Sequence, residues 1–363
     1  MLHAEYKLYS KICGATRMRR KMYRHNQKRI SVDSPCAVSI VIPTLNAGRY
    51  LERLLQRIAE QSGPLCIEVI IVDSASDDDT ASIARSFPFV HFIKIPRAEF
   101  THGRARNLGV SHAQGKYVAF LSQDALPRDE FWLPELLRPL MDDPWIAGAF
   151  SRQVPRAKAP PMERFFLKSC FPDSGQHIRK AQEDSKLSLQ DVFYSNVSSA
   201  ARRTILQRFP FDEQLIMSED QAFARDLLRA GYATAYQPSS VVIHSHQYSY
   251  WRLFQRYFDS AYSLKCIFGQ NWAETVDMGK SIMREEMSYM LKYHPTHLPR
   301  YICYLAAKIT GTAAGLNAQK LPRFMKKILS LHKGYWERRI MPVSHKHTKH
   351  KTVTAECVKV PGE

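Results

Sequence analysis

The chain has 363 residues, of which 45% are hydrophobic, and a formal net charge of +18. This hydrophobic content excludes a chain that is disordered throughout, and the length suits one large core with an appendage or two domains. The positive charge favours a polyanionic partner, such as nucleic acid, a phosphorylated substrate or an anionic lipid surface. Seven widely spaced cysteines without a CxxC pair indicate free thiols in a reducing, cytoplasmic compartment. We expect neither a secretory signal nor a membrane-spanning segment, because no apolar run reaches about 18 residues.

Residues 1–35 are rich in lysine and arginine and are expected to form a basic N-terminal arm, either disordered or lying on a membrane surface. Four apolar runs then alternate with helical patterns: AVSIVIP (37–43), IEVIIVD (67–73), FVHFIKI (89–95) and KYVAFL (116–121). This alternation predicts an α/β fold with a mostly parallel, Rossmann-like sheet and helices on both faces.

The remainder of the chain predicts a mixed region followed by helices. The polar, proline-containing stretch 151–188 is interpreted as a long loop or a mobile lid. Residues 240–249 predict a short strand that ends in two histidines. Aromatic residues at helical spacing indicate a C-terminal helical region over 249–340, which packs on the main domain or contacts a membrane. Residues 341–363 are expected to form a basic tail.

Polar side chains follow three of the predicted strands, where the carboxyl ends of parallel strands form one ligand-binding edge. These residues are Thr44, Asn46, Asp73, Gln123 and Asp124, and Pro43 stands beside them at the end of the first strand. Asp73 and Asp124 each have an alternative interpretation as ordinary turn residues, and Asn46 is also a candidate helix N-cap. For Asp77 to Asp79, an N-cap cluster is favoured over ligand binding.

Three further groups carry candidate chemistry. Arg104 and Arg106 stand near a predicted helix start and suit a diphosphate, with surface charge as the alternative. Glu219 and Asp220 open a predicted helix, so one of them is a candidate general base, with a helix cap as the alternative. His244 and His246 share one face of a strand, which suits contact with a metal or a phosphate, or simply two histidines at a domain seam.

The order of these motifs resembles that of a known family. SIVIPTLNAG, EVIIVDSASDDDT, GRARNLG, YVAFLSQDA and SED before LLRAGY follow one another as in inverting glycosyltransferases of family 2, which have the GT-A fold. The resemblance covers residues 38–249 and is greatest to the bacterial rhamnosyltransferase branch, in which SQDA replaces Asp-x-Asp, while EFTHGRARNLG, NVSSAARR and HSHQYS surround it. It implies a GT-A domain over 36–248, with a nucleotide-binding half (36–125) and an acceptor half (126–248).

The resemblance also implies roles for the site residues. Asp220 matches the catalytic base, and Glu219 is its neighbour. The strand-end residues and Arg104 and Arg106 would hold the donor. Asp124 matches the second acid of Asp-x-Asp, which faces a divalent cation, Mg²⁺ or Mn²⁺. Because Ser122 replaces the first acid, His244 or His246 would supply the missing ligand.

By the same likeness, we expect transfer of L-rhamnose from dTDP-rhamnose to a hydroxyl of a saccharide or lipid-linked acceptor in cell-surface polysaccharide synthesis. The enzyme would be cytoplasmic and in peripheral contact with the anionic inner face of the plasma membrane. A UDP- or GDP-hexose donor, or nucleotidyl transfer, are the enzymatic alternatives, although PTLNAGRY fits a nucleotidyltransferase loop poorly. A basic nucleic-acid-binding protein is the non-enzyme alternative. No recognition module supports it, so no nucleic acid partner is expected.

Overall fold

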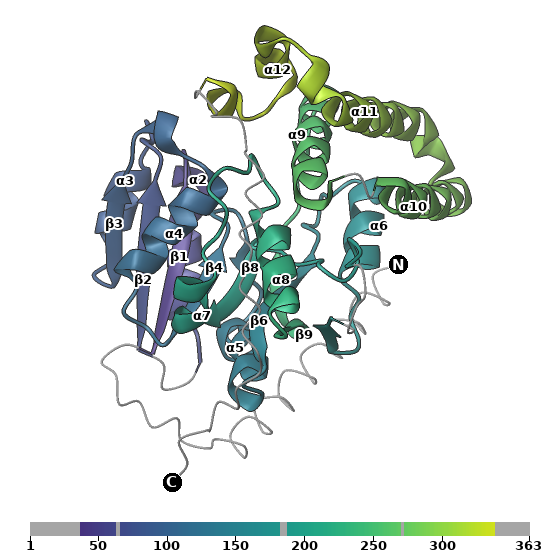
Figure 1. Ribbon diagram of the computed structural model, residues 1–363. Helices are drawn as coiled ribbons and strands as arrows, with labels where there is room; N and C mark the ends of the chain where they lie inside the picture. Colours follow the sequence, from purple (N-terminus) through teal and green to yellow (C-terminus); the bar gives the residue numbers. More distant parts are fainter. Residues whose placement is uncertain (1–36, 63–65, 182–186, 270–271, 338–363) are drawn as a thin grey trace, which may run out of the picture.

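The computed structural model describes residues 37–62, 66–181, 187–269 and 272–337. One nine-stranded sheet forms its centre, with helices on both sides and a group of C-terminal helices beside it (Figure 1). The strands are β1 (Val38–Thr44), β2 (Ile67–Asp73), β3 (Val90–Lys94), β4 (Tyr117–Leu121), β5 (Leu126–Pro127), β6 (Ile146–Val154), β7 (His177–Lys180), β8 (Ser198–Arg202) and β9 (Ala233–Ile243).

The described α-helices lie between and after these strands. They are α2 (Gly48–Ala59), α3 (Thr80–Arg85), α4 (His102–His112), α5 (Trp132–Asp142), α6 (Pro161–Cys170), α7 (Arg203–Arg208), α8 (Glu219–Arg229), α9 (Tyr250–Phe268), α10 (Trp272–Tyr293), α11 (Leu298–Leu316) and α12 (Arg323–Leu329). Single 3₁₀ turns lie at Arg97–Glu99, Pro295–His297, Ala318–Lys320 and Lys333–Trp336.

The sheet changes its strand direction half-way across. Its order is β3-β2-β1-β4-β8-β6-β9-β5, and β7 also pairs with β9. The pairs among β3, β2, β1 and β4 are parallel, as is β6 with β9. The pairs β4–β8, β8–β6, β9–β5 and β9–β7 are antiparallel. The mostly parallel sheet expected from the sequence is therefore found in the first half, and the second half is mixed. Between β6 and β8 the chain runs back along β9 as β7, with Lys180 opposite Ala233, and β8 then pairs antiparallel with both β4 and β6.

Alternation along the strands buries both faces of the sheet. In β1, Ile40 and Ile42 pack in the cluster that contains the apolar face of α2 and α5, whereas Val41 packs in the cluster of α4, α7 and α8. Successive side chains of a strand point to opposite faces, so a continuous apolar run such as that of β1 needs cover on both sides. Helices on both faces of the sheet are thus confirmed.

Two local predictions were wrong. The stretch 151–188 is not a long loop, because it contains the end of β6, all of α6 and all of β7; residues 182–186 of it lie outside the described part of the chain. Proline at the start of α6 and the burial of Met162 and Leu167 explain this helix. Asn46 is not the N-cap of α2: Ala47 holds that position, and the Asp78 carboxylate accepts from the N–H of Gly48, the first residue of the helix.

The C-terminal helices pack closely, beginning with α9 against α11. A Cβ atom on Gly311 would lie 2.5 Å from the Phe254 carbonyl oxygen, and one on Gly315 would lie 2.2 Å from that of Phe258. These glycines therefore allow the two helix backbones to approach each other. Among the described helices, none combines the length and apolarity that crossing a bilayer requires. The predicted basic arm and basic tail lie outside the described residues.

Gly109 offers a test of how α4 is seated on the sheet. A Cβ atom there would lie 2.3 Å from Val41 Cγ1 in β1. We expect Gly109→Ala to force α4 off the strand and to lower the free energy of unfolding by about 1–3 kcal/mol. Urea denaturation measures this change.

The matched control is Gly279→Ala in α10, where an added Cβ atom meets nothing within 4 Å. Since alanine is the better helix former, this control should be neutral or stabilising. Equal effects of the two substitutions would contradict the close contact of α4 with β1.

Candidate functional site

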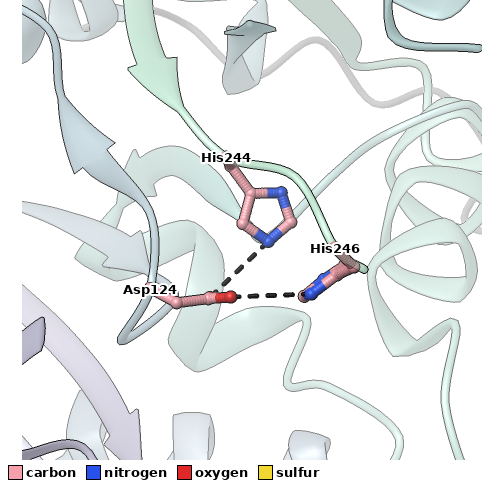
Figure 2. A group of neighbouring side chains, drawn as sticks. All are labelled: Asp124, His244 and His246. Atoms are coloured by element: carbon pink, nitrogen blue, oxygen red, sulfur yellow. Dashed lines mark ion pairs between the residues drawn. The ribbon is translucent and has the colours of Figure 1, made fainter. Parts of the chain in front are cut away.

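Asp124, His244 and His246 form one cluster at the edge of the sheet (Figure 2). The pairing of β5 with β9 explains it: Leu126 lies opposite Ile243, so the turn just before β5 meets the chain that leaves β9. His244 Nε2 lies 3.5 Å from Asp124 Oδ1, and His246 Nδ1 lies 3.6 Å from Asp124 Oδ2. One ligand atom from each residue lies within 4.8 Å of the others, so the three groups could hold a metal ion.

Neighbouring groups fix the orientation of this cluster. His244 Nδ1 lies 2.9 Å from Gln153 Oε1, so a proton on Nδ1 would be donated to Gln153 and would fix the ring, and Nε2 could bind a metal ion once it has lost its own proton. The backbone N–H of His246 donates to Glu163 Oε1 of α6 over 3.2 Å. Arg156 donates to the carbonyl oxygens of Ser245 and Asp124 and so joins the two loops.

The electrostatics of the cluster suit a cation. Burial alone would raise the pKa of Asp124, but the hydrogen bond and charge of His244, together with His246 and Arg156, hold this pKa well below its usual range. Burial and the charge of His244 lower the pKa of His246 to about 3. An ionised carboxylate beside a neutral imidazole at pH 7 is a donor set for a divalent metal ion. The expectation that His244 or His246 replaces the first acid of Asp-x-Asp, where this chain has Ser122, stays a prediction.

Glu219 and Asp220 form a second, buried cluster at the start of α8. Arg106 of α4 reaches Glu219 with Nη1 2.8 Å from Oε1, and these side chains are only 7% and 6% exposed. Asn196 donates from Nδ2 to Glu219 Oε1 (3.3 Å) and from its backbone N–H to Asp220 Oδ2 (3.0 Å). The acidic pair is therefore held by a cation and an amide from distant parts of the chain, which a simple helix cap would not require.

Asp220 has the protonation behaviour of a group that exchanges protons near neutral pH. Burial, and then the negative charge of Glu219, raise its pKa to about 7, against the opposing effects of the Asn196 N–H group and Arg106. Perturbed carboxylates of this kind concentrate at functional sites.

Consecutive residues connect the two clusters. Asn196 binds Asp220, and the carbonyl oxygen of Val197 accepts from the N–H of Ser122, two residues before Asp124. The expectation that Asp124 and Asp220 face each other across one pocket stays a prediction.

The predicted donor-binding residues lie at the strand ends with their own partners. Thr44 donates from its hydroxyl to buried Asp73, which also accepts from the Ser76 N–H group. Asn46 is exposed and accepts from the N–H of Asp77. Gln123 binds both the N–H and the carbonyl of Leu45, so it ties the β1 loop to the β4 loop.

The remaining predicted donor contacts differ in exposure. Pro43 is half-buried in β1. Arg104 is half-exposed and pairs with Glu99, whereas Arg106 is buried and pairs with Glu219. The two arginines that the sequence grouped together therefore occupy different environments.

Sequence reasoning missed four residues that shape the site: Asn196, Gln153, Arg156 and Glu163. Asn196 carried a weak signal as a polar residue just before a strand. The other three were hidden in the stretch taken for a lid, where nothing local indicated which side chains would turn toward the histidines.

Comparisons with known proteins give the family. A family model described as Glycosyl transferase family 2 matches residues 39–209. The O-antigen chain rhamnosyltransferase RfbN of Salmonella typhimurium is 32% identical over 304 residues, which cover 82% of this chain and 96% of that protein. The chain belongs to glycosyltransferase family 2. A second family member, the O-antigen chain rhamnosyltransferase WbaN of Salmonella anatum, is also 32% identical, over 82% of this chain and 95% of that protein.

A more distant likeness is found to the mannosyltransferase PcManGT from Pyrobaculum calidifontis, solved with GDP-Man and Mn²⁺. That match has a TM-score of 0.48 and 21% identity over 87% of this chain and 91% of the other.

Family membership confirms the prediction of an α/β glycosyltransferase of GT-A type with added C-terminal helices. The protein is an enzyme that transfers a sugar, a glycosyltransferase. The nucleotidyltransferase and nucleic-acid-binding alternatives are set aside on this ground.

The Asp124–His244–His246 cluster is tested by Mn²⁺ binding. We expect Asp124→Asn to weaken Mn²⁺ affinity by more than about tenfold, because it removes the only anionic ligand of the three. Electron paramagnetic resonance of free Mn²⁺ gives the affinity without any turnover.

The control is Asp79→Asn, a substitution of an exposed aspartate directly before α3. It should leave Mn²⁺ affinity unchanged. Equal Mn²⁺ affinity of the Asp124 variant and the unaltered protein would remove this cluster as a cation site.

Proposed function

We propose that this enzyme transfers L-rhamnose, with inversion at the anomeric carbon, from dTDP-rhamnose to a hydroxyl of a lipid-linked saccharide during O-antigen-type polysaccharide synthesis. The observation that carries the proposal is 32% identity, over nearly the whole of each relative, to two O-antigen chain rhamnosyltransferases. We place the reaction at the inner face of the plasma membrane, in the cytoplasm.

Asp220 acts as the general base in this proposal. The acceptor hydroxyl oxygen attacks the anomeric carbon as its proton passes to an Asp220 carboxylate oxygen, and the bond from that carbon to the diphosphate oxygen breaks. A base with a pKa of about 7 is ionised in sufficient amount at neutral pH and is still basic enough to take a proton. General-base help of this kind is worth roughly 10²–10⁴-fold in rate.

Glu219 and Arg106 are positioning residues rather than donor ligands. Arg106 is buried against Glu219, so its charge serves the acidic pair and not the leaving group. The half-exposed Arg104 is the arginine that remains for the diphosphate. Asp124, His244 and His246 would hold Mg²⁺ or Mn²⁺ there, and such an ion would neutralise the charge that develops on the departing dTDP.

The strand-end loops hold the nucleotide. Thr44, Asp73 and Asn46 provide hydroxyl, carboxylate and amide oxygens, respectively, at the ends of β1 and β2, where the base and ribose would bind. Gln123 holds the loop after β1 against the loop that carries Asp124. The binding position of the base and ribose is therefore fixed relative to that of the diphosphate.

A donor screen tests the proposed substrate. With a bacterial lipid extract as the source of acceptor, dTDP-rhamnose should release nucleoside diphosphate at least about tenfold faster than UDP- or GDP-hexoses, because the site is matched to one base and sugar. Asp220→Asn should lower this rate by at least about 10², while dTDP affinity stays within about twofold.

Asp226→Asn, a matched substitution further along α8, should retain full rate. Turnover with UDP- or GDP-hexoses but not with dTDP-rhamnose would contradict the proposal that dTDP-rhamnose is the donor. A normal rate for the Asp220 variant would mean that another group is the base.

The pH dependence of the rate tests the acidic pair. Asp220 is inactive as a base when protonated, so kcat/KM should fall about tenfold per pH unit as the pH drops below about 7 and level off above it. Glu219→Gln removes the negative charge that raises the pKa of Asp220. In the Glu219→Gln variant, the pH range over which kcat/KM rises should therefore move to lower pH by roughly one unit.

A purely structural role of Glu219 would lower the rate at every pH without moving this pH range. That result would refute the assignment of Glu219 to the control of Asp220.

A further inference from the structure

Helix α11 has a charged residue on its buried side. Of its two charged residues, Arg300 and Lys308, the second is buried and lies 3.1 Å from Glu286 Oε2 of α10. Tyr301, also buried, donates from its hydroxyl to the same carboxylate. The ammonium group of Lys308 further lies over the rings of Tyr257 and Tyr304. The charge that would normally face water thus points into the protein.

The outward side of α11 is uncharged from residue 301 to its end. Ile302 is 60% exposed and Ile309 is 49% exposed. The exposed residues recur at the three- and four-residue spacing of one helix face: Ile302, Cys303, Ala306, Ile309, Thr310 and Ala313. A helix face that meets only water ordinarily carries charged residues, so this inverted arrangement indicates that another surface covers it.

The apolar face continues into the neighbouring helix. Leu291 and Tyr293, at the end of α10, are 55% and 58% exposed, and only the turn Pro295–His297 separates them from α11. Figure 1 shows α10 and α11 together at the outer side of the molecule, away from the sheet.

The positive charge around the exposed face of α11 favours an anionic partner. Apart from the buried Lys308, residues 287–336 contain seven lysines and arginines and no aspartate or glutamate, and Glu285, Glu286 and Glu337 flank this stretch. Lys292 and Arg300 flank one end of the uncharged face, and Lys320 and Arg323 follow the other. A second copy of the chain would bring two such cationic segments together and be repelled. An anionic lipid surface attracts the cations and accepts the apolar side chains between them.

We propose that the exposed face of α11, with the adjoining end of α10, docks on an anionic bilayer and lies along its surface. Ile302 and Ile309 enter the boundary between headgroups and acyl chains, and the flanking lysines and arginines bind the headgroup phosphates. The docked helix would hold the site next to a lipid-linked acceptor. This role of the docking face rests on the proposed function, whereas the docking itself does not.

The connection from this face to the site runs through α6. Met162 of α6 packs with Met290 of α10 and Tyr301 of α11, and the next residue, Glu163, accepts from the His246 N–H group. The membrane face and the candidate metal site are therefore joined by one short helix.

Vesicle flotation tests the docking face. The full chain should float with vesicles of equal parts phosphatidylglycerol and phosphatidylcholine at low salt, and not with phosphatidylcholine alone. The double variant Ile302→Glu/Ile309→Glu should lower binding by about tenfold or more, because two anionic groups would have to enter the lipid interface. Thermal unfolding and dTDP affinity should match those of the unaltered protein, since both positions are exposed.

Trp145→Glu is the matched control, an equally exposed aromatic residue on the sheet domain (62%), and should float normally. The proposal is overturned if the double variant floats as well as the unaltered chain. It is also overturned if light scattering finds a dimer that the double variant dissociates, because a second copy would then cover the face. Flotation uses no sugar donor, so a failed donor screen with intact flotation would refute the rhamnose assignment and leave the docking face standing.

Discussion

The antiparallel pairing of β4 with β8 places both halves of the site. Leu121 at the end of β4 lies opposite Ser198 at the start of β8. The end of one strand therefore meets the beginning of the other, and the chain before β8 passes beside the turn that carries Asp124. On one side of that passage, Val197 accepts from Ser122; on the other, Asn196 holds Glu219 and Asp220. A parallel pairing at this position would place residues 196 and 197 at the opposite edge of the sheet.

Two aspartates of the site are held in opposite electrostatic environments. Asp124 is surrounded by imidazole and guanidinium groups, which keep it ionised although it is largely buried. Asp220 is buried beside another carboxylate and holds its proton to a much higher pH. An anion that stays charged suits cation binding, and a carboxylate that gains and loses a proton near pH 7 suits acid–base chemistry. The difference in environment, rather than in residue type, assigns the two roles.

The C-terminal helices also contain a buried pair of charged residues. Lys308 and Glu286 neutralise each other between α10 and α11, and the glycines of α11 allow close packing on α9. This arrangement leaves the apolar residues of α11 outside. Through Met162 and Glu163, the position of these helices bears directly on the loop that carries His246.

The sequence by itself determined the elements whose signals are local. The apolar runs of β1, β2, β3 and β4, the helix that opens at Glu219, and the polar residues at the strand ends all follow from patterns a few residues long. Asp124 could be singled out for the same reason, because a carboxylate directly after a buried strand needs no knowledge of distant neighbours. The order of the motifs was sufficient to indicate the family.

Tertiary structure alone decided the partners of these residues. Arg106 and Glu219 are separated by 113 positions, and only the packing of α4 and α8 on the same face of the sheet makes them an ion pair. The interpretation of 151–188 as a loop failed for a related reason: α6 is stabilised by burial against α10 and α11, which lie more than a hundred residues further along. Local pattern reports what a segment is able to form, whereas pairing across the chain depends on which surfaces the whole fold brings into contact.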